Sequence, residues 1–173
     1  EQRTYPNLMA REGVRGQEYN AWSKGNSPEH GVVLPFTRIL GGPIDYTPGI
    51  FNMILPDKDW SEDSFRVRST ICKQLAYYLT MFSPIQMAAD LPENYEGNAA
   101  FQFIKDVPTN WSESKVLNSK IGDYYTSLRS TLLLSALHSI NTAPSFCHAC
   151  KRALSALGPW QIQTGTLFAV CAK

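Results

Sequence analysis

The chain has 173 residues, of which 43% are hydrophobic and 18% charged, and its formal net charge is +1. This balance lacks the basic excess of nucleic-acid-binding proteins, and no apolar run reaches the ~18 residues that a membrane span requires. We therefore expect a globular chain with neither a nucleic-acid partner nor a membrane-spanning segment. Its four cysteines are unevenly spread and predict no disulfide framework: Cys72, Cys147, Cys150 and Cys171.

The first predicted element is a short buried strand over residues 3–10, followed by an acidic, glycine-containing loop. Glu12 and Glu18 lie six residues apart in this loop. On a helix this spacing would put the two on different faces, and in a strand it would hold them ~20 Å apart. Only a loop that folds back brings both carboxylates to one point, and Gly13 and Gly16 supply the backbone freedom for that.

This pairing of a strand with an acidic loop has two interpretations. A strand followed by a loop that carries acids is typical of the catalytic rim of a barrel enzyme. The same pattern fits two solvated glutamates in a surface loop. The pattern alone leaves both open.

The next stretch predicts a helix, a short strand and a long loop. A helix is expected to begin at Ser27, before Pro28, and to end before Gly41. Residues 44–47 then predict a short strand. Residues 51–62 are expected to form a long loop on the same rim as the acidic loop.

Two further helices are predicted after this loop. The first begins at Ser64 and is kinked or ended by Pro84, and the second covers 99–104 and ends before Pro108. We interpret both as part of the outer helical layer of a barrel. The apolar residues that recur on one face of the first helix are Ile71, Leu75, Tyr78, Leu79 and Phe82.

The end of the chain differs in pattern from the rest. From Trp111 the alternation predicts strands, with a turn at Gly122 and Asp123. All 15 acidic residues lie at or before Asp123, so the last 50 residues contain none. We expect no further strands after Arg129 and interpret residues 130–173 as an aberrant or unassigned tail, as a reading-frame shift would produce.

Seven linked motifs between residue 1 and about residue 129 resemble glycoside hydrolase family 97. Members of that family have a β-sandwich, a (β/α)8 barrel and a small β-rich C-terminal domain, and they are several times longer than this chain. The resemblance therefore implies an α/β fragment, with residues 1–107 as the C-terminal part of the barrel and 108–129 as the start of the β-rich domain. The motifs are Arg-Thr-Tyr-Pro-Asn at 3–7, Arg-Glu-Gly-Val-Arg-Gly-Gln-Glu-Tyr at 11–19, Leu-Pro-Phe-Thr-Arg at 34–38, Gly-Pro-Ile-Asp-Tyr-Thr-Pro-Gly at 42–49, Arg-Ser-Thr at 68–70, Ser-Pro-Ile-Gln-Met-Ala-Ala-Asp at 83–90 and Phe-Gln-Phe-Ile-Lys-Asp-Val-Pro at 101–108.

The resemblance also implies an activity and its residues. Family members are calcium-dependent α-glucosidases and α-galactosidases, so we expect an α-linked oligosaccharide substrate, an α-glucoside first, and a periplasmic or secreted location. Glu18 matches the general acid, which protonates the departing oxygen. Glu12 matches a calcium ligand, and Glu18 is close enough to the ion to count as a second. Calcium takes 6–8 oxygens, so these two cannot complete the site.

The other half of the catalytic machinery is expected upstream of residue 1. There the family has its general base or its nucleophile, and Glu1 is more simply interpreted as a solvated glutamate than as a substitute base. We therefore do not expect the isolated chain to be an active enzyme. The alternative is a non-catalytic remnant of a hydrolase with a structural or carbohydrate-binding role.

Two more residues each allow two roles. His30 either packs or caps a helix or has a role in the site, because the family often has histidine there. Asp45 either lines the sugar site or forms a salt bridge with Arg38.

A Cys-x-x-Cys pair lies in the tail. Cys147 and Cys150, with His138 and His148 nearby, could be interpreted as a zinc knuckle. A single pair without a second is weak evidence, because zinc sites supply four ligands at set spacings.

Overall fold

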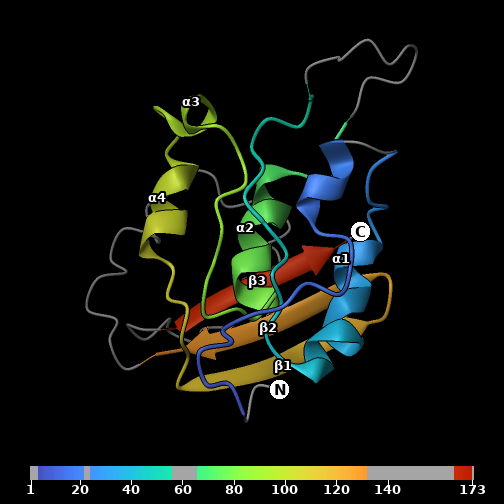
Figure 1. Cartoon of the computed structure of the whole chain (residues 1–173), viewed down its shortest axis with the longest axis vertical. Helices are drawn as coiled ribbons and strands as arrows, with labels where there is room; N and C mark the ends of the chain where they lie inside the picture. The colour runs from blue at the N-terminus through green and yellow to red at the C-terminus, as the bar shows by residue number, and fades with distance from the viewer. Residues whose placement is uncertain (1–3, 22–23, 56–65, 132–165, 173) are drawn as a thin grey trace.

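The computed structural model describes residues 4–21, 24–55 and 66–131 in full and residues 166–172 as backbone. Helices and strands are mixed, which confirms the α/β class in this coarse sense (Figure 1). No helix in these ranges is both long and apolar enough to cross a membrane. With η for a 3-10 helix, the elements in chain order are η1 (Gln17–Ala21), α1 (His30–Val33), η2 (Leu34–Phe36), η3 (Arg38–Gly41), α2 (Ile71–Thr80), α3 (Pro92–Tyr95), α4 (Ala100–Asp106), β1 (Glu113–Lys120), β2 (Tyr124–Ser130) and β3 (Thr166–Ala172).

The longest described helix, α2, organises the core. It begins after Thr70, whose hydroxyl accepts a hydrogen bond from the Lys73 amide at 3.2 Å and so caps the helix. The prediction that this helix starts at Ser64 is wrong, because residues 66–70 are not helical. Its end before Pro84 is confirmed, since the last helical residue is Thr80. The apolar residues buried around α2 are Val32, Leu34, Ile44, Tyr46, Ala76, Tyr77, Tyr78, Leu79, Met81 and Val107.

The predicted helix from Ser27 is present only in pieces. The α-helical part is the single turn α1, and two 3-10 turns, η2 and η3, follow it. Pro35 lies inside η2 and lacks the amide hydrogen that a continuing helix would use. The stop at the glycines is confirmed, because η3 ends at Gly41 and Gly42 has a φ of 112°.

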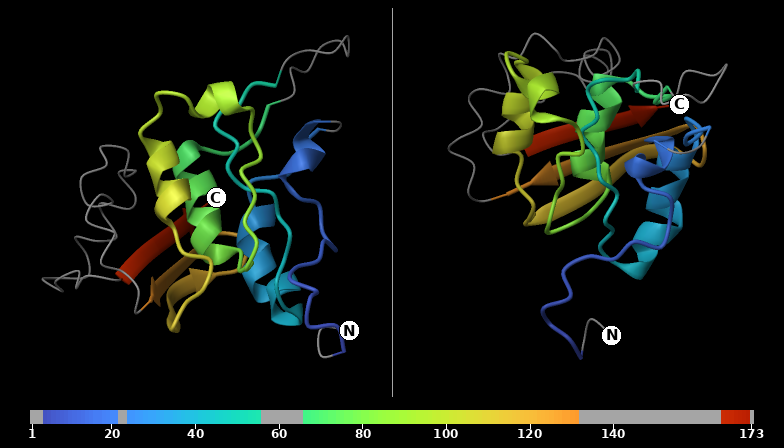
Figure 2. Two further views of the ribbon diagram at one scale, coloured as in Figure 1. Left: turned by 60° about the vertical axis from the view of Figure 1, so that its left-hand side comes forward. Right: turned by 45° about the horizontal axis from the view of Figure 1, so that its top comes forward.

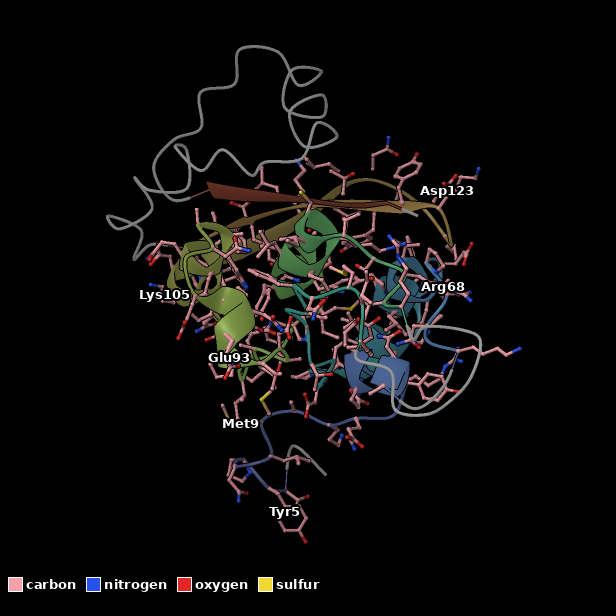
Figure 3. The ribbon with its side chains drawn as sticks, turned by 90° about the horizontal axis from the view of Figure 1, so that it is seen from above. Tyr5, Met9, Arg68, Glu93, Lys105 and Asp123 are labelled. Atoms are coloured by element: carbon pink, nitrogen blue, oxygen red, sulfur yellow. The ribbon has the colours of Figure 1, made fainter. Side chains whose placement is uncertain are left out.

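Neither of the two strands predicted in the first half forms a ladder, and only Ile44 at the start of the second takes part in an isolated bridge. Arg11 pairs in parallel with Ile44, and no longer ladder involves residues 4–10 or 44–47. Residues 5–8 form a turn, with the Leu8 amide donating to the Tyr5 carbonyl at 3.0 Å. Tyr5 and Met9 are 60% and 42% exposed, at the edge of the molecule (Figure 3). The prediction of a buried strand over residues 3–10 is therefore wrong for the residues described.

The strands predicted from Trp111 are confirmed as an antiparallel hairpin of β1 and β2. Gly122, with a φ of 75°, lies in the turn between them. β2 also pairs with β3, so the sheet has the order β1-β2-β3. The expectation of no strand after Arg129 is wrong for this segment, because β3 falls in the range assigned to the tail.

The helices lie on one face of this sheet (Figures 2 and 3). Ser127 and Arg129 are the buried residues of β2, two apart as expected for one face of a strand. The Arg129 guanidinium lies 5.8 Å from the ring centres of both Phe82 and Trp111. Hydrophobic and cation–π contacts thus join the sheet to the α2 region.

A second small core lies under α3 and α4. The predicted helix over 99–104 is confirmed as α4. The single turn α3 precedes it, and Pro92 favours its start because proline suits the first turn of a helix. Phe51, Tyr95 and Ala100 form this core. It holds the segment around residue 50 beside α2.

Candidate functional site

The acidic loop, residues 11–21, is held at two points. At its start the Arg11 carbonyl accepts a hydrogen bond from the Asp45 amide at 3.0 Å. Farther along the loop the Gln17 amide donates to the Tyr46 carbonyl at 3.1 Å. The loop is therefore fixed against residues 45–46 at two points.

The two glycines of the loop have different roles. Gly13 has a φ of 116°, which confirms the predicted need for backbone freedom, and a Cβ there would lie 3.1 Å from the Arg38 Nε. Gly16 does not have a positive φ, and a Cβ on it would collide with the carboxylate of Glu18. Gly16 thus leaves room for the Glu18 side chain, which folds back over it.

Glu18 has a defined position in η1. Its side chain is half-buried. The Gly16 amide donates to its Oε1 at 3.2 Å, and the Thr47 hydroxyl donates to its Oε2 at 2.5 Å. Both oxygens thus have a donor, and the carboxylate is held in one orientation.

Glu12 is held by its backbone and not by its side chain. It is exposed, and no residue in the described ranges hydrogen bonds to its carboxylate. Its carbonyl accepts hydrogen bonds from Nε and Nη2 of Arg38 at 3.1 and 2.8 Å. The Glu12 carboxylate is thus available to a ligand.

Arg38 acts as a clamp on the loop. Among the residues that the structure describes, its guanidinium donates hydrogen bonds only to backbone carbonyls, those of Arg11, Glu12, Gly42 and Pro43. The interpretation of Asp45 as a salt-bridge partner of Arg38 is therefore wrong. Asp45 is half-buried, with no partner for its carboxylate among the described residues, which leaves the sugar-site interpretation as a prediction.

His30 has the packing role of the two that we considered. Its Nε2 lies 2.8 Å from the Arg15 carbonyl, and its ring centre lies 6.0 Å from that of Tyr46. Burial lowers the pKa of His30, which favours the neutral ring. Neutral His30 with its proton on Nε2 donates to the loop and so fixes Arg15.

A buried amide network behind the loop was missed by the sequence analysis. Gln74 of α2 is fully buried, and its Nε2 donates to Gln17 Oε1 at 3.2 Å. Asn20 donates to the same Oε1 at 3.2 Å and accepts from the Asn26 amide at 2.9 Å. The network connects α2 to η1. Amide residues occur throughout polar surfaces, so no signal in the sequence distinguishes these four.

These residues fit calcium only as part of a ligand set. Carboxylates are the hard oxygen ligands that calcium prefers, and each Glu18 oxygen retains lone pairs beyond those used by its donors. Within the described ranges, however, no three His, Cys, Asp or Glu side chains gather as a metal group. Glu12 and Glu18 would supply two ligands. Glu1, His138, Cys147, His148 and Cys150 lie outside the described residues.

Two named proteins are similar to this chain in amino-acid sequence. No protein-family model matches it. A retaining α-galactosidase of Bacteroides thetaiotaomicron is 37% identical over 131 residues, which are 73% of this chain and 20% of that protein. A probable retaining α-galactosidase of Streptomyces bingchenggensis is 31% identical over 123 residues, which are 70% of this chain and 17% of that protein.

Solved structures match it as well. A glycoside hydrolase family 97 enzyme from Pseudoalteromonas sp. strain K8, solved with acarbose and, as a variant, with panose, is 50% identical with a TM-score of 0.68. The match covers 75% of this chain and 20% of that one. A β-arabinopyranosidase at 24% identity and a TM-score of 0.62 shares the fold. The chain thus spans about a fifth of the length of these relatives.

Proposed function

This chain belongs to glycoside hydrolase family 97, and from that membership we propose that it supplies the general acid of a hydrolase that cleaves α-glycosidic bonds. Glu18 is the acid in this proposal. The observation that carries it is the fixed orientation of the Glu18 carboxyl, which has a donor on each oxygen and is only half-buried. A group held in this way can meet a leaving oxygen in a reproducible geometry.

Glycosidic bond cleavage needs this acid because an alcohol is a poor leaving group. A carboxylic acid that protonates the departing oxygen spares the sugar alkoxide from leaving as an anion. After the transfer, the Gly16 amide and the Thr47 hydroxyl are in place to stabilise the carboxylate. Hydrogen bonds to a charged carboxylate are stronger than those to a neutral group.

Calcium is the second part of the proposal. Glu12 and Glu18 would hold the ion, with the remaining oxygens supplied from outside the described residues. When bound, the ion supplies positive charge that orients substrate hydroxyls. Two observations support a ligand role for Glu12: its carboxylate is exposed, and Arg38 fixes its backbone.

The proposed fold and substrate follow from the family. Residues 1–107 would be the end of the (β/α)8 barrel and 108–129 the start of the β-rich domain, and the protein would act in the periplasm or outside the cell. For the substrate, the Pseudoalteromonas structure with panose, an oligosaccharide of α-linked glucose, supports an α-glucoside. The α-galactosidase names of the sequence relatives support an α-galactoside as the second candidate.

The test is Glu18→Gln in the full-length protein, because the amide keeps the shape of the side chain and removes the proton. General acids contribute about 10²–10⁴ in rate, and we expect that loss in kcat/KM on maltose or on an α-galactosyl disaccharide. The ratio kcat/KM is the readout because it reports cleavage of the glycosidic bond and not a later hydrolysis step. The loss should shrink sharply on a glycosyl fluoride, whose leaving group departs without a proton.

The matched control is Glu12→Gln in the same loop. We expect it to lower rates on both types of substrate alike and to be eased by added calcium, since it weakens the ion site. Equal losses for Glu18→Gln on both substrate types would exclude the general-acid role. A full-length protein that binds these sugars without cleaving them would favour the non-catalytic alternative.

A further inference from the structure

From the contacts of Thr47 we infer that this residue positions the general acid, an inference that rests on the proposed role of Glu18. The Thr47 hydroxyl lies between two groups of the acidic loop. It donates to Glu18 Oε2 at 2.5 Å and accepts from the Gln17 amide at 3.0 Å. Because the Gln17 amide occupies an acceptor site on the hydroxyl oxygen, the hydroxyl hydrogen is directed to Glu18.

The backbone of Thr47 is unusual and supports this role. Its φ is 51°, and it is the only described residue other than glycine with a positive φ. Thr47 is β-branched and precedes Pro48, and each of these two features disfavours its backbone conformation. Residues held in such strained conformations cluster at functional sites, where surrounding contacts keep them in place.

The surrounding contacts that hold Thr47 come from α2 and the chain after it. The Ala89 amide donates to the Pro48 carbonyl at 3.0 Å. The Tyr78 hydroxyl lies 3.2 Å from the same carbonyl and shares its single hydrogen with the Met87 carbonyl, which is nearer at 2.6 Å. Gln74 Oε1 accepts from the Gly49 amide at 3.0 Å. The core thus fixes the two residues after Thr47, and this directs the hydroxyl toward Glu18.

The effect on Glu18 follows from the pair of donors on its carboxyl. The Gly16 contact at 3.2 Å is the longer of the two and comes from the same loop, so it moves with Glu18. The Thr47 contact comes from a separate segment that is anchored to the core. The hydrogen bond from Thr47 therefore orients the Glu18 carboxyl relative to the rest of the site.

The experiment replaces the hydroxyl in the full-length protein. Thr47→Val keeps the β-branch and the shape, and Thr47→Ala removes the hydroxyl without a β-branch. Thr47→Ser keeps the hydroxyl and is the matched control. In every variant the Gln17 amide keeps its hydrogen bond to the Tyr46 carbonyl. The loop therefore stays attached at Gln17 even where the Thr47 hydroxyl is lost.

We expect Thr47→Val and Thr47→Ala to lower kcat on maltose or on an α-galactosyl disaccharide by about 10- to 100-fold. The reason is that a misplaced catalytic group can cost about 10²-fold in rate. KM on the disaccharide should stay within about threefold, and so should kcat/KM on the glycosyl fluoride, because breaking that bond does not need the acid. Thr47→Ser should restore kcat on the disaccharide. Thr47→Val combined with Glu18→Gln should be no slower than Glu18→Gln alone, because both remove the same function.

Two results would overturn the inference while the proposed function stands. One is a wild-type kcat for both hydroxyl-free variants alongside a normal loss for Glu18→Gln. The other is an equal loss on the disaccharide and the fluoride, which would indicate general damage to the fold. If Glu18→Gln itself gives no loss that depends on the leaving group, the proposed function fails and the positioning role fails with it.

Discussion

Replacing Gln74 with methionine should destabilise the protein far more than a loss of ordinary surface hydrogen bonds would. Gln74 is fully buried, and its side chain makes four hydrogen bonds to described residues. Its Oε1 accepts from the amides of Gly49 and Ile50 at 3.0 and 3.3 Å. Methionine matches the length of glutamine but accepts only weakly, so both buried amides would lose their partner.

The magnitude follows from these two amides. An orphaned buried donor costs about 1–3 kcal/mol, which gives about 2–6 kcal/mol for the pair. The other partners are less affected, because Gln17 Oε1 keeps its bond from Asn20. Burying a thioether in place of an amide offsets roughly 1 kcal/mol of this loss. We therefore expect Gln74→Met to lower the free energy of unfolding by about 1–5 kcal/mol.

The matched control is Gln102→Met on α4. Gln102 is exposed and donates to Asp106 at 2.8 Å, four residues along the helix. Such a pair contributes about 0.2–0.5 kcal/mol, so this variant should be nearly neutral. Urea unfolding would compare the two variants, and hydrogen exchange would follow the amides of Gly49 and Ile50. Equal stability of both variants, or unchanged exchange at these two amides in Gln74→Met, would refute the reasoning.

Two other variants test the packing and the charge around the loop. Gly31→Ala should lower the unfolding free energy by about 1–3 kcal/mol, because its Cβ would collide with the ring of buried Tyr77. Gly41→Ala meets only Arg38 Nη1 at 3.9 Å and should be close to neutral, so similar thermal midpoints for the two would contradict this. For His30, burial lowers the pKa in the folded state, so stability should fall as the pH drops below about 6.5, where the unfolded chain gains a proton that the folded chain does not. His30→Gln keeps an N–H donor and should reduce this dependence in urea titrations across that window; an unchanged slope would show that His30 does not titrate as described.

The sequence by itself determined the features that depend on local chemistry. The alternation from Trp111, with a turn glycine at Gly122, predicted the β1–β2 hairpin, because strand periodicity and turn residues act over a few neighbours. Gly13 was correctly predicted to need backbone freedom. The end of α2 before Pro84 was also predicted from the residues, although its start was not.

Only the tertiary structure decided which partners these residues meet. Thr47 and Glu18 are 29 residues apart in sequence, and Gln74 and Gln17 are 57 apart, so no local pattern connects them. The same holds for Arg38, whose charge suggested an acidic partner but whose guanidinium donates to backbone carbonyls of the loop. β3 was missed because a strand forms when an edge such as that of β2 is available for pairing, and the sequence of a segment does not record that edge. A long-range hydrogen bond depends on where the fold brings two groups together, and that is why the supports of the candidate acid became visible only in three dimensions.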